Sequence, residues 1–169
     1  MEAELFREEQ RFRHWWIWLL IAPPAVLPWI AFVVQIILHR QFGDHPGPDW
    51  MIWLMLGLFG IGLPLLFARI RMTVVVTTDD LRIRYFPFYA GRIPLSDLAS
   101  ATVTKYSWGD FGGFGIHWSP GRGICYTMGG NQGVQVVLAN GRQRLIGSLK
   151  SAELIAAITV VRRDLRPRP

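Results

Sequence analysis

The residues best suited to bind a ligand or partner lie between Tyr106 and Arg122, where aromatic side chains alternate with glycines. Glycine permits backbone angles that other residues avoid, and exposed aromatic side chains on a loop commonly mark a contact surface. The sequence therefore predicts a contact site for a protein partner or a lipid headgroup, built from Trp108, Asp110, Phe111, Phe114 and Arg122. The alternative is that these aromatic residues complete the core beneath a long hairpin while Asp110 closes a turn.

Residues suited to catalysis are few. The single cysteine, Cys125, falls in a predicted strand, where a reduced and buried thiol is inert. The four histidines are spread along the chain and are not expected to share a metal: His14, His39, His45 and His117. The glycine pairs do not follow a strand and open a helix as a phosphate-binding loop requires. We therefore expect no enzyme, no cofactor and no metal site.

Two long apolar stretches precede the segment that carries the predicted contact site. Residues 15–38 contain no charged residue in 24 positions, and residues 50–68 contain none in 19. About 20 apolar helical residues suffice to cross a bilayer, so the sequence predicts a transmembrane hairpin over residues 15–68. A soluble core helix would keep a polar stripe, and a secretory signal would be shorter with a net positive leader. Three prolines in the first span, at positions 23, 24 and 28, predict a kink or a loosened turn, and a re-entrant segment is the alternative.

The arginines predict the orientation of this hairpin. Residues 1–14 form a leader with three arginines, two more follow the second span, and the connecting loop 39–49 has one. Because Lys and Arg favour the cytoplasmic side, both termini are expected in the cytoplasm and the loop outside. Aromatic and basic residues at the ends of the spans are expected to anchor them at the membrane interface. These anchors are Trp15, Trp16, Trp50, Arg69 and Arg71.

The remaining chain is long enough for one separate domain over residues 72–163, followed by a basic, proline-containing tail at 164–169. From residue 72 onward it holds twelve Lys and Arg against six Asp and Glu, the whole +6 excess of the protein. A basic domain tethered beside an anionic leaflet gains about 1 kcal/mol per well-placed basic residue. Membrane proximity therefore explains the charge, and no recognition helix or stacking motif indicates nucleic acid.

Alternating and β-branched patterns predict seven strands in this domain, followed by one helix. The strands are expected at residues 72–77, 81–86, 92–95, 99–106, 123–128, 133–138 and 142–147. The last two flank Asn140-Gly141, which suits a tight hairpin turn. From about Ser151, an apolar stripe at Leu154, Ile155, Ile158 and Val161 predicts an amphipathic helix that covers the open end of a curved antiparallel sheet.

Two segments carry a resemblance to a family: VVVTTDDLRIRYFPFYAGRIPLSDLASATV (Val74 to Val103) and GVQVVLANGRQRLIGSLKSAELIAAI (Gly133 to Ile158). With the preceding hairpin, they resemble bacterial membrane proteins that carry a pleckstrin-homology-like (PH-like) domain. The resemblance implies a membrane-anchored α+β protein of the bacterial inner membrane, with two transmembrane helices and a seven-stranded, partly open antiparallel barrel capped by a C-terminal helix. It implies binding or assembly. It does not imply phosphoinositide recognition, because the first hairpin turn, Thr77 to Asp80, is acidic.

Two functions from different classes remain. The first is a non-enzymatic scaffold whose barrel face or strand edge binds a membrane or cytoplasmic protein, or a second copy of the chain. The second is a sensor of anionic lipid headgroups at the inner leaflet. Salt distinguishes them, because screening over about 10 Å at 0.1 M weakens a charge-driven lipid contact more than an apolar protein interface.

Overall fold

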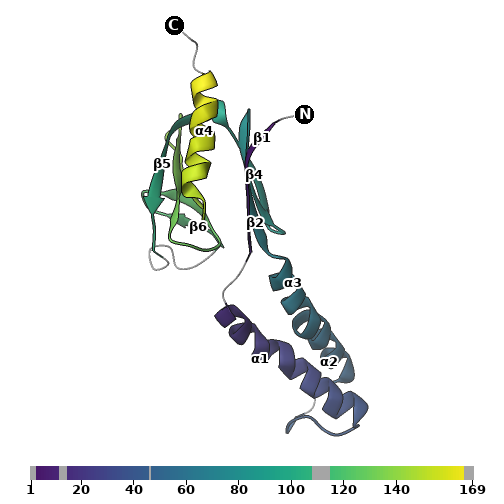
Figure 1. Cartoon of the computed structure of the whole chain (residues 1–169). Helices are drawn as coiled ribbons and strands as arrows, with labels where there is room; N and C mark the ends of the chain where they lie inside the picture. Colours follow the sequence, from purple (N-terminus) through teal and green to yellow (C-terminus); the bar gives the residue numbers. More distant parts are fainter. Residues whose placement is uncertain (1–2, 12–14, 46, 108–114, 166–169) are drawn as a thin grey trace. The chain divides into compact units, whose positions relative to one another are not determined.

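The computed structural model describes residues 3–11, 15–45, 47–107 and 115–165 (Figure 1). The chain forms two compact units. One is a helical hairpin over residues 12–70, and the other combines residues 1–11 with residues 71–169. The β-rich unit is therefore built from chain on both sides of the hairpin.

The hairpin contains two continuous helices, as the apolar stretches predicted. The first, Trp15–Ile37, joins α1 (Trp15–Ala31) to a π-helical segment, η1 (Phe32–Ile37). The second, Asp49–Arg69, comprises α2 (Asp49–Met55), a π-helical segment η2 (Leu56–Gly62) and α3 (Leu63–Arg69). Both are long and apolar enough to cross a membrane, with a mean hydropathy of 2.2 in their most apolar windows. The first helix continues through its three prolines, and the loosened turn lies beyond them in η1.

The two helices of the hairpin pack on each other through aliphatic and aromatic residues. Ile17, Ile21 and Ala25 of α1 form a buried cluster against Leu63 and Phe67 of α3. Near the middle of the hairpin, the indole Nε1 of Trp29 donates a hydrogen bond of 3.2 Å to the carbonyl oxygen of Gly60. An alanine at position 60 would crowd this contact, because its Cβ would lie 2.9 Å from Leu56 Cδ1 and 3.0 Å from Trp29 Nε1, so these side chains would have to shift.

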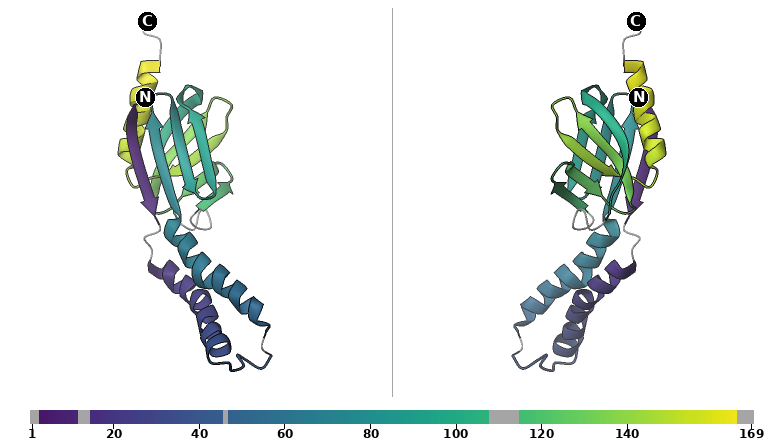
Figure 2. Two further views of the ribbon diagram at one scale, coloured as in Figure 1. Left: turned by 90° about the vertical axis from the view of Figure 1, so that its right-hand side faces the viewer. Right: turned by 90° about the vertical axis from the view of Figure 1, so that its left-hand side faces the viewer.

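The first sheet of the β-rich unit has four antiparallel strands in the order β1-β2-β3-β4 (Figure 2). Alternate residues of β2, namely Met72, Val74 and Val76, are fully buried, which is the period-2 burial expected of a sheet with one face on a core. The strands are β1 (Glu4–Arg11), β2 (Arg71–Thr77), β3 (Asp80–Phe86) and β4 (Tyr89–Pro94).

Strand β1 corrects the expectation that residues 1–14 form a leader outside the domain. It pairs with β2 along its length, with Arg11 opposite Arg71 and Glu4 opposite Thr77. Its buried face consists of Phe6, Glu8 and Gln10. Two of these three residues are polar, so the hydrophobic alternation that reveals a half-buried strand is absent from the sequence.

The second sheet has five strands in the order β5-β8-β9-β7-β6 and follows a short 3₁₀ turn, η3 (Leu95–Asp97). All its pairs are antiparallel except β7 and β9, which run parallel because the β8–β9 hairpin inserts between β5 and β7. The strands are β5 (Leu98–Lys105), β6 (Gly115–Ser119), β7 (Gly123–Thr127), β8 (Gln132–Leu138) and β9 (Gln143–Gly147).

The α+β class is confirmed, whereas the expected seven-stranded, partly open antiparallel barrel is wrong in its number of strands and in being wholly antiparallel. The described residues form nine strands in two sheets that do not close, and one strand pair is parallel. The seven expected strands are present near their expected positions. The two missed strands are β1 and β6, and in β6 the large apolar residues Ile116 and Trp118 face solvent, so the strand has no buried face to reveal it.

Helix α4 (Ser151–Leu165) follows the second sheet, as its apolar stripe predicted. Leu154 and Ile158 are fully buried, and Val161 nearly so. The helix packs against β5 and β8 of one sheet and β1 and β2 of the other, and so covers one of the two openings between the sheets (Figure 1). The hydroxyl of Ser151 donates to the carbonyl oxygen of Ser148 at 2.8 Å and fixes the start of the helix.

Candidate functional site

Most of the predicted contact site lies outside the described residues. Trp108, Asp110, Phe111 and Phe114 all belong to the undescribed segment 108–114. Arg122 is described, and it is engaged with the sheet. Its Nη1 donates to the carbonyl oxygen of Lys105 at 3.4 Å, and its own carbonyl oxygen accepts a hydrogen bond from Gln135 Nε2 at 3.1 Å.

The predicted interface anchors have two different environments. Trp15, Trp16 and Trp50 are exposed on the hairpin, as aromatic anchors require. Arg69 is exposed at the end of α3. Arg71 instead begins β2, where its guanidinium lies 3.8 Å from a carboxylate oxygen of Glu9 and 5.6 Å from the centre of the Phe86 ring. Arg71 therefore also links three strands of the first sheet.

A cavity of about 440 Å³ lies in the β-rich unit between the tips of the β6–β7 and β8–β9 hairpins. Trp118, Ile124 and Arg144 occupy one row across β6, β7 and β9, so their side chains share one face of the sheet. That face also carries the buried residues Tyr126 and Ile146, which makes it the inner face. We call this cavity the barrel mouth; it is lined by Trp118, Ser119, Gly121, Gly123, Ile124, Gly141, Arg142, Gln143 and Arg144.

Glycine at position 123 allows the two hairpins to approach and form the mouth. Its φ of +71° lies in the left-handed region, and a Cβ there would lie 1.9 Å from the carbonyl oxygen of Gln143. Any larger residue would force β7 and β9 apart where their parallel pairing begins. Gly121 has a similar φ of +75° with open space around it, so of these two glycines only Gly123 combines the backbone angle with a close approach.

A polar chain joins the two sheets beside the mouth. Arg144 Nη1 donates to the Tyr126 hydroxyl at 2.6 Å, and that hydroxyl donates to the Tyr89 hydroxyl of β4 at 2.9 Å. Burial, together with the hydrogen bond to Tyr89, raises the pKa of Tyr126, and the charge of Arg144 only partly opposes this. The Nε of Arg144 is buried and has no hydrogen-bond partner among the described residues. The guanidinium therefore keeps an unused buried donor at Nε.

The opposite face of the second sheet holds Cys125 and His117, which resemble catalytic residues by type; Cys125 is buried and His117 is half-buried. Cys125 is fully buried in a cluster with Tyr106 and Leu145, as expected for a structural thiol. Burial raises the pKa of the Cys125 thiol, although the charge of Arg122 partly counteracts it, so the reactive thiolate is disfavoured. Burial also lowers the pKa of His117, which favours its neutral form.

A buried carboxylate, Glu8, fixes β1 to the segment that leads into α4. It accepts hydrogen bonds from the Ser148 hydroxyl at 2.5 Å, from the Leu149 backbone N–H at 2.8 Å and from Gln10 Nε2 at 3.0 Å. Gln10 Nε2 also donates to the carbonyl oxygen of Gly147 at 3.0 Å. These bonds satisfy a carboxylate that is only 7% exposed, so Glu8 has a structural role.

A second buried carboxylate, Asp80, holds the turn between β2 and β3. It accepts hydrogen bonds from Thr77 Oγ1 at 3.0 Å and from Arg82 Nε at 2.8 Å, and it forms an ion pair with Arg92. Burial alone would raise the pKa of Asp80. The hydrogen bonds from Arg82 and Thr77 and the charges of Arg82 and Arg92 outweigh burial and hold that pKa below its usual value. The acidic turn seen in the sequence is thus neutralised locally.

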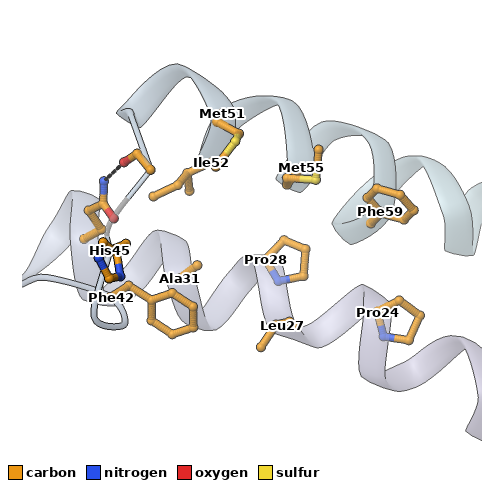
Figure 3. Close-up of a pocket in the computed structure, with 12 residues that line it drawn as sticks. Pro24, Leu27, Pro28, Ala31, Phe42, His45, Met51, Ile52, Met55 and Phe59 are labelled. Carbon is orange, nitrogen blue, oxygen red and sulfur yellow. Dashed lines mark hydrogen bonds between the residues drawn. The ribbon is translucent and has the colours of Figure 1, made fainter.

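The hairpin contains its own pocket of about 390 Å³, between α1 and the second helix (Figure 3). Pro24 and Pro28 line one side of it, and Met51, Met55 and Phe59 line the other. At one end, Gln35 Nε2 donates to the Gly47 carbonyl oxygen and to Asp49 Oδ1, both at 2.8 Å. The lining is mainly apolar, so this pocket provides shape and apolar contact rather than reactive groups.

Among the described residues, no group of three or more His, Cys, Asp or Glu side chains is arranged to hold a metal ion. No family model, curated protein or solved structure matches the chain.

Proposed function

We propose that the chain is a non-enzymatic membrane protein that presents a PH-like domain in the cytoplasm for protein binding, scaffolding or self-assembly, with the barrel mouth as its contact site. The observation that carries this proposal is the exposure of Trp118 and Ile116, which are 71% and 39% exposed on edge strand β6. Edge strands with exposed apolar side chains pair or aggregate unless a partner covers them. Arg142 and Arg144 line the same cavity as Trp118, so this surface is positively charged as well as apolar.

The hairpin supports membrane insertion. A core helix of a soluble protein is mostly buried, whereas only 22% and 11% of the most apolar windows of the two helices are buried here. The second helix is also remote from the N-terminus, where a signal sequence would lie. In lipid, the exposed apolar side chains of both helices would face acyl chains.

The pairing of β1 with β2 supports a hairpin that returns to the side it left. β1 ends at Arg11 and β2 begins at Arg71, so the two strands of one sheet bracket the whole hairpin. A hairpin attached at both ends to one folded unit crosses the bilayer an even number of times. With the arginine distribution, this argues for both termini in the cytoplasm and, given the resemblance, for the bacterial inner membrane.

Two sheets with a C-terminal helix over one opening are consistent with a PH-like domain. The added N-terminal strand and the parallel β7–β9 pair depart from the expected pattern. The chemistry of the mouth favours binding over catalysis. A guanidinium does not release its proton, and the raised pKa of Tyr126 keeps its hydroxyl protonated at neutral pH.

Recognition of anionic headgroups is the second candidate, because Arg142 and Arg144 line the mouth. The position of the β8–β9 turn weighs against it. The backbone N–H of Ala139, in this turn, donates to the carbonyl oxygen of Asp97, and the N–H of Leu95 donates to the carbonyl oxygen of Asp79. Asp79 follows the end of β2 that is opposite Arg71, so the β8–β9 turn lies at that end of the strands. A headgroup site would be better placed near Arg11 and Arg71, where the chain joins the hairpin.

Site-specific photo-crosslinking tests the proposed function. A benzoylphenylalanine placed at Trp118 in the full chain should yield a discrete protein adduct in native membranes, of twice the chain mass if the partner is a second copy. The same probe at Arg84, which is exposed on β3, is the matched control. An Ile116→Asp substitution should abolish the Trp118 adduct. Equal adducts at both positions, or none at Trp118, would contradict the proposal.

A further inference from the structure

The barrel mouth places an apolar surface beside two cationic groups. Ile116, Trp118 and Ile124 lie on the same face of β6 and β7 and form an apolar shelf. Arg144 lies in the same row as Trp118 and Ile124, two strands away from Trp118. Neighbouring strands are about 4.8 Å apart, so roughly 10 Å separates the indole end of the shelf from the guanidinium end.

The charges of this site are not neutralised within the described chain. The side chain of Arg142 makes no hydrogen bond or ion pair there, and only its backbone is bonded: its N–H donates to Asn140 Oδ1 and its carbonyl oxygen accepts from the Leu138 N–H. Arg144 contacts only the neutral Tyr126 hydroxyl, and its buried Nε has no hydrogen-bond partner among the described residues. None of the residues that line the cavity is acidic. A buried guanidinium donor without an acceptor is costly, and an anion in the cavity would satisfy it.

We propose that the mouth binds an acidic segment of a protein partner, with a carboxylate between Arg142 and Arg144 and an apolar side chain on the Trp118 shelf. This inference rests on the proposed function and names the chemistry of the partner. An extended chain advances about 3.3 Å per residue, so the carboxylate and the apolar side chain would be two or three positions apart in the partner. A carboxylate also matches the fork of a guanidinium, which offers paired donors.

The composition of the site favours a protein segment over a bilayer or a second copy. A lipid headgroup would have to reach the end of the strands remote from Arg71, where the β8–β9 turn lies. A second copy of the chain would bring the same two arginines and a net charge of +6, so like charges would meet. An acidic partner instead complements both the local and the overall charge.

The test uses the full chain in nanodiscs of phosphatidylcholine, which carries no net charge. The probe is a Glu-Glu-Ala-Leu-Ala-amide peptide with fluorescein on its N-terminal amine, and binding is followed by fluorescence anisotropy. We expect saturable binding with a Kd below about 1 mM at low salt. Raising the salt from about 50 to 500 mM should weaken it severalfold. Two control peptides, one with Gln for both Glu residues and one with Ser for Leu, should each bind at least about tenfold more weakly.

Variants of the chain localise the binding. Arg142→Gln is the main variant because its side chain holds nothing else in the described structure, and we expect a loss of about tenfold. Trp118→Ser should have a similar effect. Arg84→Gln removes an equal charge from an exposed position on β3 and should leave binding unchanged. Equal losses for Arg142→Gln and Arg84→Gln, or equal binding of the Glu and Gln peptides, would overturn the proposal.

Two further outcomes separate this inference from the function on which it rests. If phosphatidylglycerol nanodiscs displace the peptide, the mouth binds a headgroup and the inference fails. If the Trp118 photo-adduct forms but is unchanged by Arg142→Gln, a partner binds without using the arginines, so the inference fails while the proposed function stands. If the chain with the probe at position 118 and no other substitution forms no adduct, the proposed function and this inference both fail.

Discussion

The Ser148 hydroxyl donates a hydrogen bond of 2.5 Å to the carboxylate of Glu8, across 140 positions of the sequence. Glu8 lies in β1, before the hairpin, and Ser148 lies just before α4, long after the hairpin. This contact therefore joins the segment before the hairpin to the C-terminal part of the domain. The β-rich unit therefore completes only when the segment before the hairpin has returned to it. This relationship makes residues 4–11 part of the domain.

Loss of the Glu8 carboxylate should destabilise the β-rich unit. A Glu8→Ala substitution leaves the Ser148 hydroxyl and the Leu149 N–H without their acceptor, and buried unsatisfied groups cost about 1–3 kcal/mol each. We expect a loss of about 3 kcal/mol in the free energy of unfolding, measured by urea titration in detergent micelles. Glu4→Ala, in the same strand but in an exposed pair with Arg7, should cost less than about 1 kcal/mol. Equal losses would show that Glu8 contributes no more than a surface charge.

The depressed pKa of Asp80 should appear as acid sensitivity. Its stabilising contribution is fully present above the ordinary Asp pKa of 3.8 and is lost as the pH falls through the lower folded value. An Asp80→Asn variant should be less stable than the wild type at pH 7 by about 1–3 kcal/mol, and the difference should shrink towards pH 2. Unfolding free energies measured across this range check it. Asp97→Asn, at an exposed position, should show no such convergence.

A side chain at position 123 should disrupt the mouth more than one at position 121. Both glycines have left-handed φ angles, so alanine at either costs about 1–2 kcal/mol of backbone strain. Only Gly123→Ala also places a Cβ against the Gln143 carbonyl, so its thermal midpoint should fall well below that of Gly121→Ala. If the two variants have the same thermal midpoint, the pairing of β7 with β9 does not require this close approach.

The Cys125 thiol should report unfolding. It is the only cysteine in the chain, it is fully buried, and burial raises its pKa, so the thiolate needed for attack is both scarce and inaccessible. A disulfide reagent such as dithionitrobenzoate should react at neutral pH only when urea unfolds the domain. Rapid reaction of the folded chain in detergent would instead place the thiol at an accessible surface.

Sequence periodicity predicted the elements that have strong burial patterns. The hairpin has no polar face, β2 is rich in β-branched residues, and β3 alternates cleanly. The stripe through Leu154 and Ile158 identified α4. The strand β1 could not be predicted in the same way, because Glu8 and Gln10 face inward and are stabilised by hydrogen bonds to residues 140 and 137 positions away. Tertiary contacts, rather than a local hydrophobic pattern, therefore determine that residues 4–11 form a strand.

The candidate site was harder to predict than the fold. The sequence predicted a site within residues 106–122, where aromatic residues and glycines concentrate. The described mouth takes Trp118 from that segment but combines it with Ile124 and Arg144 on two other strands. Their shared row depends on the parallel pairing of β7 with β9, which no local pattern specifies. The signal that was available is the Asn140-Gly141 turn with Arg142 and Arg144 beside it, which predicts two arginines near a hairpin tip.

Cysteine accessibility tests the central claim, that the hairpin spans the membrane and the domain lies on the cytoplasmic face, most directly. In a Cys125→Ala background, single Asp44→Cys and Asn140→Cys variants probe the connecting loop and the β8–β9 turn in bacterial spheroplasts. A membrane-impermeant maleimide should label the Asp44→Cys variant in intact spheroplasts and the Asn140→Cys variant only after lysis. Labelling of both variants from outside, or protection of both until lysis, would contradict the account.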